Sequence, residues 1–158
     1  MKSRTAYLIL PDIRSAQNVG ALFRTADAAG VAKIFLVGIT PAPLDRFGRE
    51  RSDIAKAALG AEKTIPWESV KTLAPLVRRL KKEGFQIIGI EQAEHSVDYK
   101  KVRCADKVAF ILGNEVDGMS KGALAQCDVV AEIPMRGMKE SLNVSVAGGV
   151  SLFRMLGI

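Results

Sequence analysis

Short apolar runs and longer segments with helical spacing alternate along the 158-residue chain. Apolar runs that end at glycine, proline or polar residues are typical of buried strands. Such runs predict strands at 6–10, 33–37, 63–65, 86–90, 108–112 and 129–133. Segments in which apolar residues recur every three or four positions predict helices at 15–29, 52–59, 70–83 and 142–156.

The repeated strand-then-helix order predicts an α/β fold with a mostly parallel sheet and helices on both of its faces. Residues 38–51, which contain Pro41 and Pro43, interrupt this order and predict a long loop. Pro75 lies inside the predicted helix 70–83 and is expected to kink or delay it. No linker, repeat or low-complexity tract divides the sequence, so residues 1–158 are expected to form one domain.

The composition indicates the cellular location of the protein and whether it has disulfides or a metal site. No apolar stretch reaches the ~18 residues that span a membrane, and the apolar start is interrupted by Pro11, too early for a signal peptide. We therefore expect a cytoplasmic protein with no membrane partner. The two cysteines, Cys104 and Cys127, are expected to be buried structural thiols, and His95 a surface loop residue. Such a set predicts neither a disulfide framework nor a metal site.

The net charge of +6 favours a polyanionic partner such as nucleic acid. Four cations gather in and just after the predicted loop 38–51, namely Arg46, Arg49, Arg51 and Lys56. Loops that hold an RNA backbone have this composition, although a charge cluster is also typical of an ordinary solvated face.

Two loops that follow predicted strands carry the candidate chemistry. In open α/β sheets, ligands bind at the carboxyl ends of the strands, and 112–115 and 133–143 both begin there. The segment 113–120 has the glycine spacing of a P-loop, but Met119 replaces the lysine, and the carboxylates of Glu115 and Asp117 would repel a triphosphate. The dinucleotide fingerprint is absent too. The acidic loop therefore favours a ligand with hydroxyls, amines or positive charge, with a plain turn as the alternative.

Two predicted helices add further candidates. Gly20 lies inside the first helix, where it costs on the order of 1 kcal/mol against alanine and indicates a close approach. Arg24 suits phosphate recognition, or is a plain surface arginine. Ser141 or Asn143 can cap the last helix. That helix is apolar on more than one face, with small residues at 147–149, which predicts cover by its own sheet and by a second subunit.

In order and spacing, these segments resemble the SpoU (TrmH) family of RNA 2′-O-ribose methyltransferases, within the SPOUT superfamily. The matching motifs are Asn18-x-Gly20-Ala21-x-x-Arg24, then Leu112-Gly113-Asn114-Glu115-x-x-Gly118, then Ile133-Pro134-Met135 followed by Ser141-Leu142-Asn143-Val144-Ser145-Val146-Ala147, and also 56–62 running into 65–67. The match covers almost the whole chain.

The resemblance implies transfer of a methyl group from S-adenosylmethionine to a ribose 2′-hydroxyl of RNA. It also implies a trefoil knot at the carboxyl end and a homodimer with the helices at both chain ends at its interface. The expected cofactor-binding residues are Ile90, Gly113, Ile133, Ser141 and Leu142. The expected catalytic residues are Arg24, Asn18, Glu115, Ser141 and Asn143.

Arg24 is expected to act across the dimer interface. With a pKa above ~12, arginine is a poor base, so we expect it to clamp the phosphate and hydroxyl and stabilise developing alkoxide charge, with Glu115 and Asn18 orienting it. In its short length the chain resembles the family members that modify the tRNA wobble position. Its third motif instead resembles the enzymes that act on the tRNA D-loop and on ribosomal RNA. The sequence therefore does not decide between tRNA and rRNA as the substrate. The alternatives are a non-catalytic RNA-binding dimer and an unknotted nucleotide-binding domain.

Overall fold

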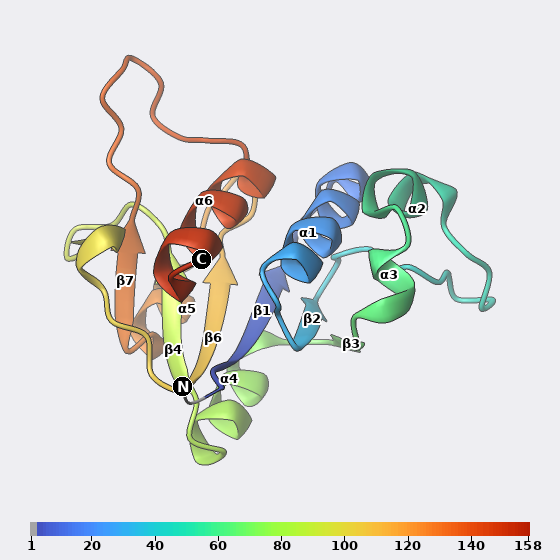
Figure 1. Cartoon of the computed structure of the whole chain (residues 1–158), viewed down its shortest axis with the longest axis horizontal. Coiled ribbons are helices and arrows are strands. Elements are labelled where there is room, and N and C mark those ends of the chain that lie inside the picture. Colours follow the sequence, from blue (N-terminus) through green and yellow to red (C-terminus); the bar gives the residue numbers. More distant parts are fainter. Residues whose placement is uncertain (1–2) are drawn as a thin grey trace.

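A computed structural model describes residues 3–158 and contains one sheet of seven parallel strands (Figure 1). Across the sheet the strands follow the order β3-β2-β1-β6-β4-β7-β5. Their bounds are β1 Thr5–Pro11, β2 Lys33–Val37, β3 Trp67–Val70, β4 Gln86–Ile90, β5 Val97–Asp98, β6 Lys107–Leu112 and β7 Val129–Glu132. The prediction of a parallel α/β sheet is thus confirmed.

Helices cover both faces of the sheet, also as predicted. They are α1 Ala16–Ala28, α2 Ser52–Ala58, α3 Ala61–Thr64, α4 Leu73–Lys82, α5 Lys121–Gln126 and α6 Val144–Leu156, with a 3₁₀ turn η1 at Tyr99–Lys101. Figure 1 shows α1 and α6 side by side on one face, and α4 and α5 on the other. Within residues 3–158, no helix is long and apolar enough to cross a membrane.

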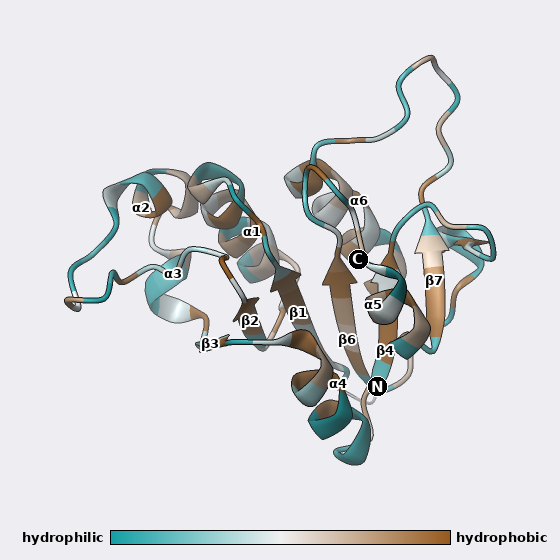
Figure 2. Cartoon of the chain, turned by 180° about the vertical axis from the view of Figure 1, so that it is seen from behind, coloured by the Kyte–Doolittle hydropathy of each residue, from teal (hydrophilic) through white to brown (hydrophobic). Residues whose placement is uncertain are grey.

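The two faces explain why the central strands are continuous apolar runs. Side chains alternate along a strand, so Leu8 and Leu10 of β1 enter the core beneath α1 and α6, whereas Ile9 enters the core beneath α4. All three are fully buried. Figure 2 shows the same pattern as a hydrophobic band along β1, β6 and β4.

The strand predicted at 63–65 is wrong. Ala61–Thr64 forms α3, and the third strand begins only at Trp67, after Pro66. Gly60 separates α2 from α3 with a φ of 96°, a conformation that glycine adopts without strain, so a helical pattern is broken into two short helices. Trp67, the first residue of this strand, is half-buried and packs against the core.

The helix predicted at 70–83 begins later, because Val70 ends β3. Thr72 precedes the first residue of α4, Leu73, which places Pro75 in the first helical turn. Backbone N–H groups in that turn have no partner within the helix, so the missing N–H of proline costs little and no kink results.

Three short elements were not predicted, namely β5, η1 and α5. Their lengths of two, three and six residues are too short for a recognisable period. Cys104 and Cys127, expected to be buried, are half-buried free thiols, whereas His95 is exposed, as expected.

The close approach predicted at Gly20 is confirmed. A Cβ at this position would lie 2.5 Å from the Ile54 carbonyl oxygen and 2.7 Å from the Ala57 Cβ, both in α2. Gly20 therefore allows the backbones of α1 and α2 to touch, which accounts for a glycine inside a helix.

Candidate functional site

A cavity of about 570 Å³ opens at the carboxyl ends of β4, β6 and β7. Its volume is within the range of small-molecule sites, and its position is where open α/β sheets bind ligands. It is lined mainly by residues 90–92 and 112–119 and by the two ends of the segment 133–144, with Leu124 and Ala147 completing the wall. We call residues 113–119 the acidic loop and residues 133–143 the arch, which rises away from the body of the protein (Figure 1). All five residues expected to bind the cofactor lie around this cavity: Ile90, Gly113, Ile133, Ser141 and Leu142.

Hydrogen bonds fold the acidic loop onto itself. The Asn114 side-chain oxygen accepts from the backbone N–H groups of Val116 and Asp117, at 2.9 and 2.7 Å. The Gly118 N–H also donates to the Asn114 carbonyl, at 3.2 Å. Gly118 has a φ of 66°, which suits glycine at the end of this turn. Part of the loop's structure therefore comes from contacts within its own sequence.

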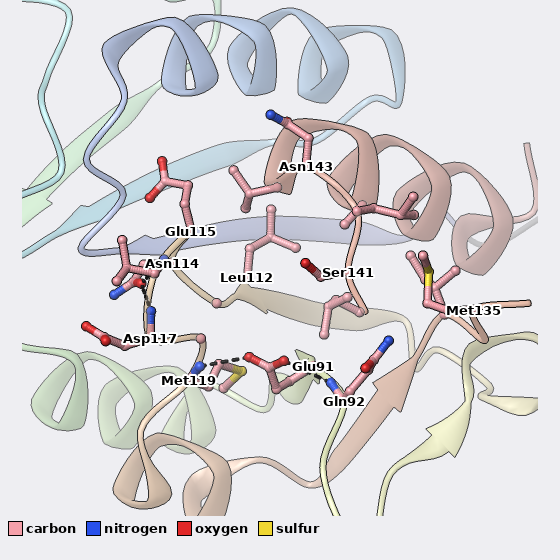
Figure 3. A pocket seen from close by; sticks show the side chains of 18 of the residues that line it. Glu91, Gln92, Leu112, Asn114, Glu115, Asp117, Met119, Met135, Ser141 and Asn143 are labelled. Carbon is pink, nitrogen blue, oxygen red and sulfur yellow. Dashed lines mark hydrogen bonds between the residues drawn. The ribbon is translucent and has the colours of Figure 1, made fainter. Parts of the chain in front are cut away.

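Glu91 closes the same loop from β4 and was not among the predicted site residues. Its Oε2 accepts from the Met119 N–H at 2.8 Å (Figure 3). The same oxygen would lie 2.7 Å from a Cβ on Gly113 and would also collide with one on Gly118. Glu91 directly follows the apolar run 86–90, and that position at a strand end was the signal available in the sequence.

Glu115 joins the acidic loop to the start of α1. Its carboxylate accepts hydrogen bonds from the N–H groups of Arg14 and Ser15 and from the Asn18 side-chain amide, at 3.1 to 3.2 Å. Desolvation by burial acts to raise the pKa of Glu115, but these donors and its own N–H outweigh it and hold the pKa below the ordinary value. Two predicted catalytic residues, Asn18 and Glu115, are thus in direct contact.

Asn143 and Ser141 differ in their roles although both line the cavity. Asn143 is the N-cap of α6, since its Oδ1 accepts from the N–H and the hydroxyl of Ser145, at 2.8 and 2.6 Å. Ser141 is exposed, and across residues 3–158 it makes no hydrogen bond. Figure 3 shows Glu115 and Asn143 on one side of the cavity and Glu91, Gln92 and Met119 on the other.

Arg24 lies outside the cavity of its own chain. It is exposed on α1, about 9 Å further along the helix than Asn18 at 1.5 Å per residue. In the part of the chain that the structure describes, it has no hydrogen bond or ion pair. Its guanidinium is therefore available to a ligand or a second subunit.

The cavity combines apolar walls with negative charge. Ile90, Leu112, Ile133 and Leu142 provide the apolar surface, and Glu91, Glu115 and Asp117 the carboxylates. Such a lining fits a ligand with a flat apolar part and a cationic part, and it disfavours phosphate. Among residues 3–158, no cluster of three or more histidine, cysteine or acidic side chains could hold a metal ion.

The predicted RNA-binding cations lie at the other end of the molecule, in and after residues 43–51, which we call the arginine hairpin (Figure 1). Arg49 pairs with Asp45 at 3.0 Å, and Arg51 with Asp53 at 2.7 Å. Surface pairs of this kind contribute little to stability, so phosphates can compete for these cations.

The other two predicted cations, Arg46 and Lys56, are exposed. Neither has a carboxylate partner within residues 3–158. The four cations therefore lie together at one end of the molecule, among the carboxylates of Asp45, Glu50 and Asp53, and the structure does not bring them to the cavity of the same chain.

Fold and site define a parallel α/β protein with a cavity at the carboxyl edge of its sheet, and the lining of that cavity fits a small cationic ligand. The sequence profile of the SpoU rRNA Methylase family matches residues 5–153. The chain belongs to this family.

Named relatives agree with that assignment. The chain is 39% identical over 145 residues to the 23S rRNA (guanosine-2′-O-)-methyltransferase RlmB of Neisseria meningitidis, covering 92% of this chain and 55% of the relative. It is 40% identical over 147 residues to RlmB of Xylella fastidiosa, covering 92% and 56%. The chain thus spans about half the length of these relatives.

A solved structure shows the same fold. The AdoMet-bound rRNA methyltransferase from Sinorhizobium meliloti superposes with a TM-score of 0.86 at 31% identity, over 96% of this chain and 55% of the other. Its fold therefore matches nearly all of the described chain.

Proposed function

We propose that the chain is an S-adenosylmethionine-dependent methyltransferase that modifies a ribose 2′-hydroxyl of RNA. The observation that carries this proposal is the cavity at the carboxyl ends of β4, β6 and β7, where apolar walls face three carboxylates. S-adenosylmethionine has an apolar base and a cationic sulfonium, so the residues present fit it. The relatives named above, whose names specify guanosine of 23S rRNA, favour ribosomal RNA as the substrate.

Positioning accounts for much of the proposed catalysis. The cofactor would supply a methyl group on a sulfonium, from which a 2′-oxygen can displace it. Ile90, Gly113, Ile133, Ser141 and Leu142 would hold the cofactor, while Glu91 and Asn114 keep the acidic loop in place. A reactant held by preorganised loops meets a lower entropic barrier.

Arg24 would contact the RNA from the second subunit. A fork of five donors can hold a phosphate and stabilise negative charge on the 2′-oxygen as its proton is lost. Asn18 lies on the same helix, and its hydrogen bond to Glu115 would hold α1 in a fixed position beside the cavity. Asn143 would direct the first turn of α6 toward the substrate.

A homodimer that uses α1 and α6 would bring Arg24 to the partner's cavity. Gly148 of α6 packs against Leu22 of α1, so the small residues of α6 face its own chain. Val146 and Val150, one helical turn apart, remain 48% and 37% exposed. An apolar stripe at this spacing supports burial by a second copy.

The knot expected at the carboxyl end is also a proposal. After β7, beyond β4 in the sheet, the chain returns through the arch to α6, which packs against α1 and against η1 in the β4–β6 connection. A return that brings α6 against an earlier connection supports threading, a rare exception among folds. An experimental electron-density map that follows the chain through residues 91–106 and 133–156 would decide it.

Calorimetry tests the proposed cofactor. S-adenosylhomocysteine should bind, whereas ATP should not, because the carboxylates repel phosphate. If S-adenosylhomocysteine fails to bind, the enzyme proposal is wrong.

Methylation of ribosomal RNA tests the reaction. Mass mapping of 2′-O-methyl groups with and without the protein should reveal one site that is lost when the 2′-hydroxyl is replaced by hydrogen. Arg24→Lys should lower the methylation rate at unchanged cofactor affinity, because a lysine cannot form the fork. Cofactor and RNA binding without any methylation would instead favour the non-catalytic dimer.

A further inference from the structure

Phe47 lies at the tip of the arginine hairpin and is 67% exposed. The hairpin is a closed structure, because the Asp45 N–H donates to the Arg49 carbonyl at 2.9 Å and the Gly48 N–H donates to the Asp45 carbonyl at 3.0 Å. Gly48 has a φ of 76°, which completes the turn directly after the phenylalanine. A large apolar ring is thus presented to solvent by a defined turn.

The Asp45 carboxylate fixes the backbone that carries the ring. Its Oδ1 accepts from the N–H groups of Phe47 and Arg49, at 2.8 and 3.0 Å, and its Oδ2 accepts from the Arg49 Nε at 3.0 Å. The hairpin therefore holds Phe47 in position through polar contacts, and the ring has no packing role that explains it. Because folding already orders the turn, a ligand that binds Phe47 loses little affinity to the conformational entropy of this segment.

Two guanidinium groups accompany the ring. Arg46 and Arg49 lie over Phe47 at 4.9 and 5.0 Å from the ring centroid. Apart from Phe47 and Gly48, every residue from 45 to 50 is charged. Phe47 and Leu44 are the exposed large apolar residues of the hairpin. Two such side chains among charges are a poor surface for a protein partner, which needs a contiguous apolar patch of several hundred Å².

The same arrangement matches a nucleotide, which has a flat face for stacking and a phosphate on each side. We propose that Phe47 is a stacking platform for an unpaired base of the RNA substrate, which would displace the Arg46 guanidinium from the ring to a flanking phosphate, while Arg49 stays paired with Asp45 beside the ring. The inference rests on the proposed function, since it assumes an RNA substrate, but it assigns a new residue and a single-stranded target. A base in a duplex is stacked on both sides and cannot use the platform.

Fluorescence anisotropy tests the platform with a labelled oligouridine of about 12 nucleotides, a length within the usual site sizes, and with a duplex of equal length. Stacking on an aromatic side chain contributes ~1–3 kcal/mol per base, so Phe47→Ala should weaken oligouridine binding roughly 5- to 150-fold. Phe47→Leu, which keeps an apolar side chain but no ring, should lose as much. Phe47→Tyr should bind within about twofold of the wild type, and duplex affinity should not change.

The salt dependence separates stacking from charge. Phe47→Ala should leave the slope of log Kd against log salt unchanged, whereas Arg46→Ala should lower it by about one. Unchanged oligouridine affinity in Phe47→Ala would overturn the proposal, as would an equal loss in Phe47→Tyr. Melting curves should match the wild type for all four variants, because the substituted side chains are exposed.

Calorimetry with S-adenosylhomocysteine tests the proposed methyltransferase function independently of the stacking platform. Phe47→Ala should bind the cofactor product as the wild type does. A wild-type protein that fails to bind it overturns the methyltransferase proposal, whereas the oligouridine experiment alone decides the platform.

Discussion

The acidic loop and the arch border the same cavity but are built in different ways. The acidic loop is held by Asn114, by Glu91 and by the contacts of Glu115 with the start of α1. Within the described chain, residues 134–142 of the arch make no hydrogen bond, and Met138 is fully exposed. The comparison teaches that hydrogen bonds within the described chain hold one wall of the cavity and leave most of the other wall without such contacts.

A matched pair of glycine substitutions gives the largest expected effect. Gly113→Ala places a Cβ 2.7 Å from the Glu91 carboxylate and 3.0 Å from the backbone at Gly118, so we expect a loss of about 1–3 kcal/mol in stability. Gly137→Ala meets no atom within 4 Å and should stay within about 0.5 kcal/mol. Urea unfolding measures both. Equal losses in the two variants would remove the distinction between the loops.

Glu115→Gln tests the link between the acidic loop and α1. The variant keeps an oxygen acceptor but loses the charge, so we expect a cost of about 1 kcal/mol, small for a charged acceptor because the carboxylate is exposed. Because folding lowers the pKa of Glu115, its contribution is present above the ordinary value of 4.5 and is lost as the pH falls through the folded pKa. The stability difference from the wild type should therefore shrink below about pH 4.5. A difference that is constant with pH would contradict this role.

The arch is tested at its junction with α6. Asn143→Ala removes the N-cap and should cost about 1 kcal/mol, which lowers the Tm by a few degrees. Ser141→Ala removes no hydrogen bond of the described chain and should leave the Tm unchanged. Calorimetry with S-adenosylhomocysteine then isolates Ser141 as a ligand contact if its affinity falls without a change in Tm. A Tm loss in Ser141→Ala would show a structural role instead.

The smallest expected effect concerns Cys127, beside the acidic loop, and is measured as the rate at which its thiol is alkylated. Cys127 lies close to Gly89, beside Met119 at the end of that loop. Burial, together with the negative charge of Asp128, raises the pKa of the thiol to about 11. At pH 8 only about one molecule in a thousand carries the thiolate, so alkylation by iodoacetamide should be slow without any change in stability. Fast alkylation, followed by mass spectrometry, would indicate that the acidic loop opens readily.

The sequence predicted the parallel sheet because its central strands are buried on both faces, which leaves continuous apolar runs such as 6–10 and 108–112. The sequence could not predict the secondary structure of segments in which this pattern is weak. Residues 61–64 contain one apolar and three polar side chains over a single turn, which is too short a pattern to distinguish a strand from α3.

The position of the cavity was predicted for a related reason. Loops that follow strands indicated 112–115 and 133–143, and the family resemblance named Gly113, Glu115 and Asn143. No local pattern, however, reveals that the Glu91 carboxylate accepts a hydrogen bond from a loop residue 28 positions away. Nor does spacing distinguish Asn143, which caps α6, from Ser141, which does not. Those assignments depend on tertiary contacts.

The contact at Gly20 has a consequence for the substrate. Because the backbones of α1 and α2 touch there, α2 packs directly against the helix that carries Arg24. If Arg24 contacts the ribose and Phe47 a base, as proposed above, a fixed α1–α2 contact would set the number of nucleotides between the two.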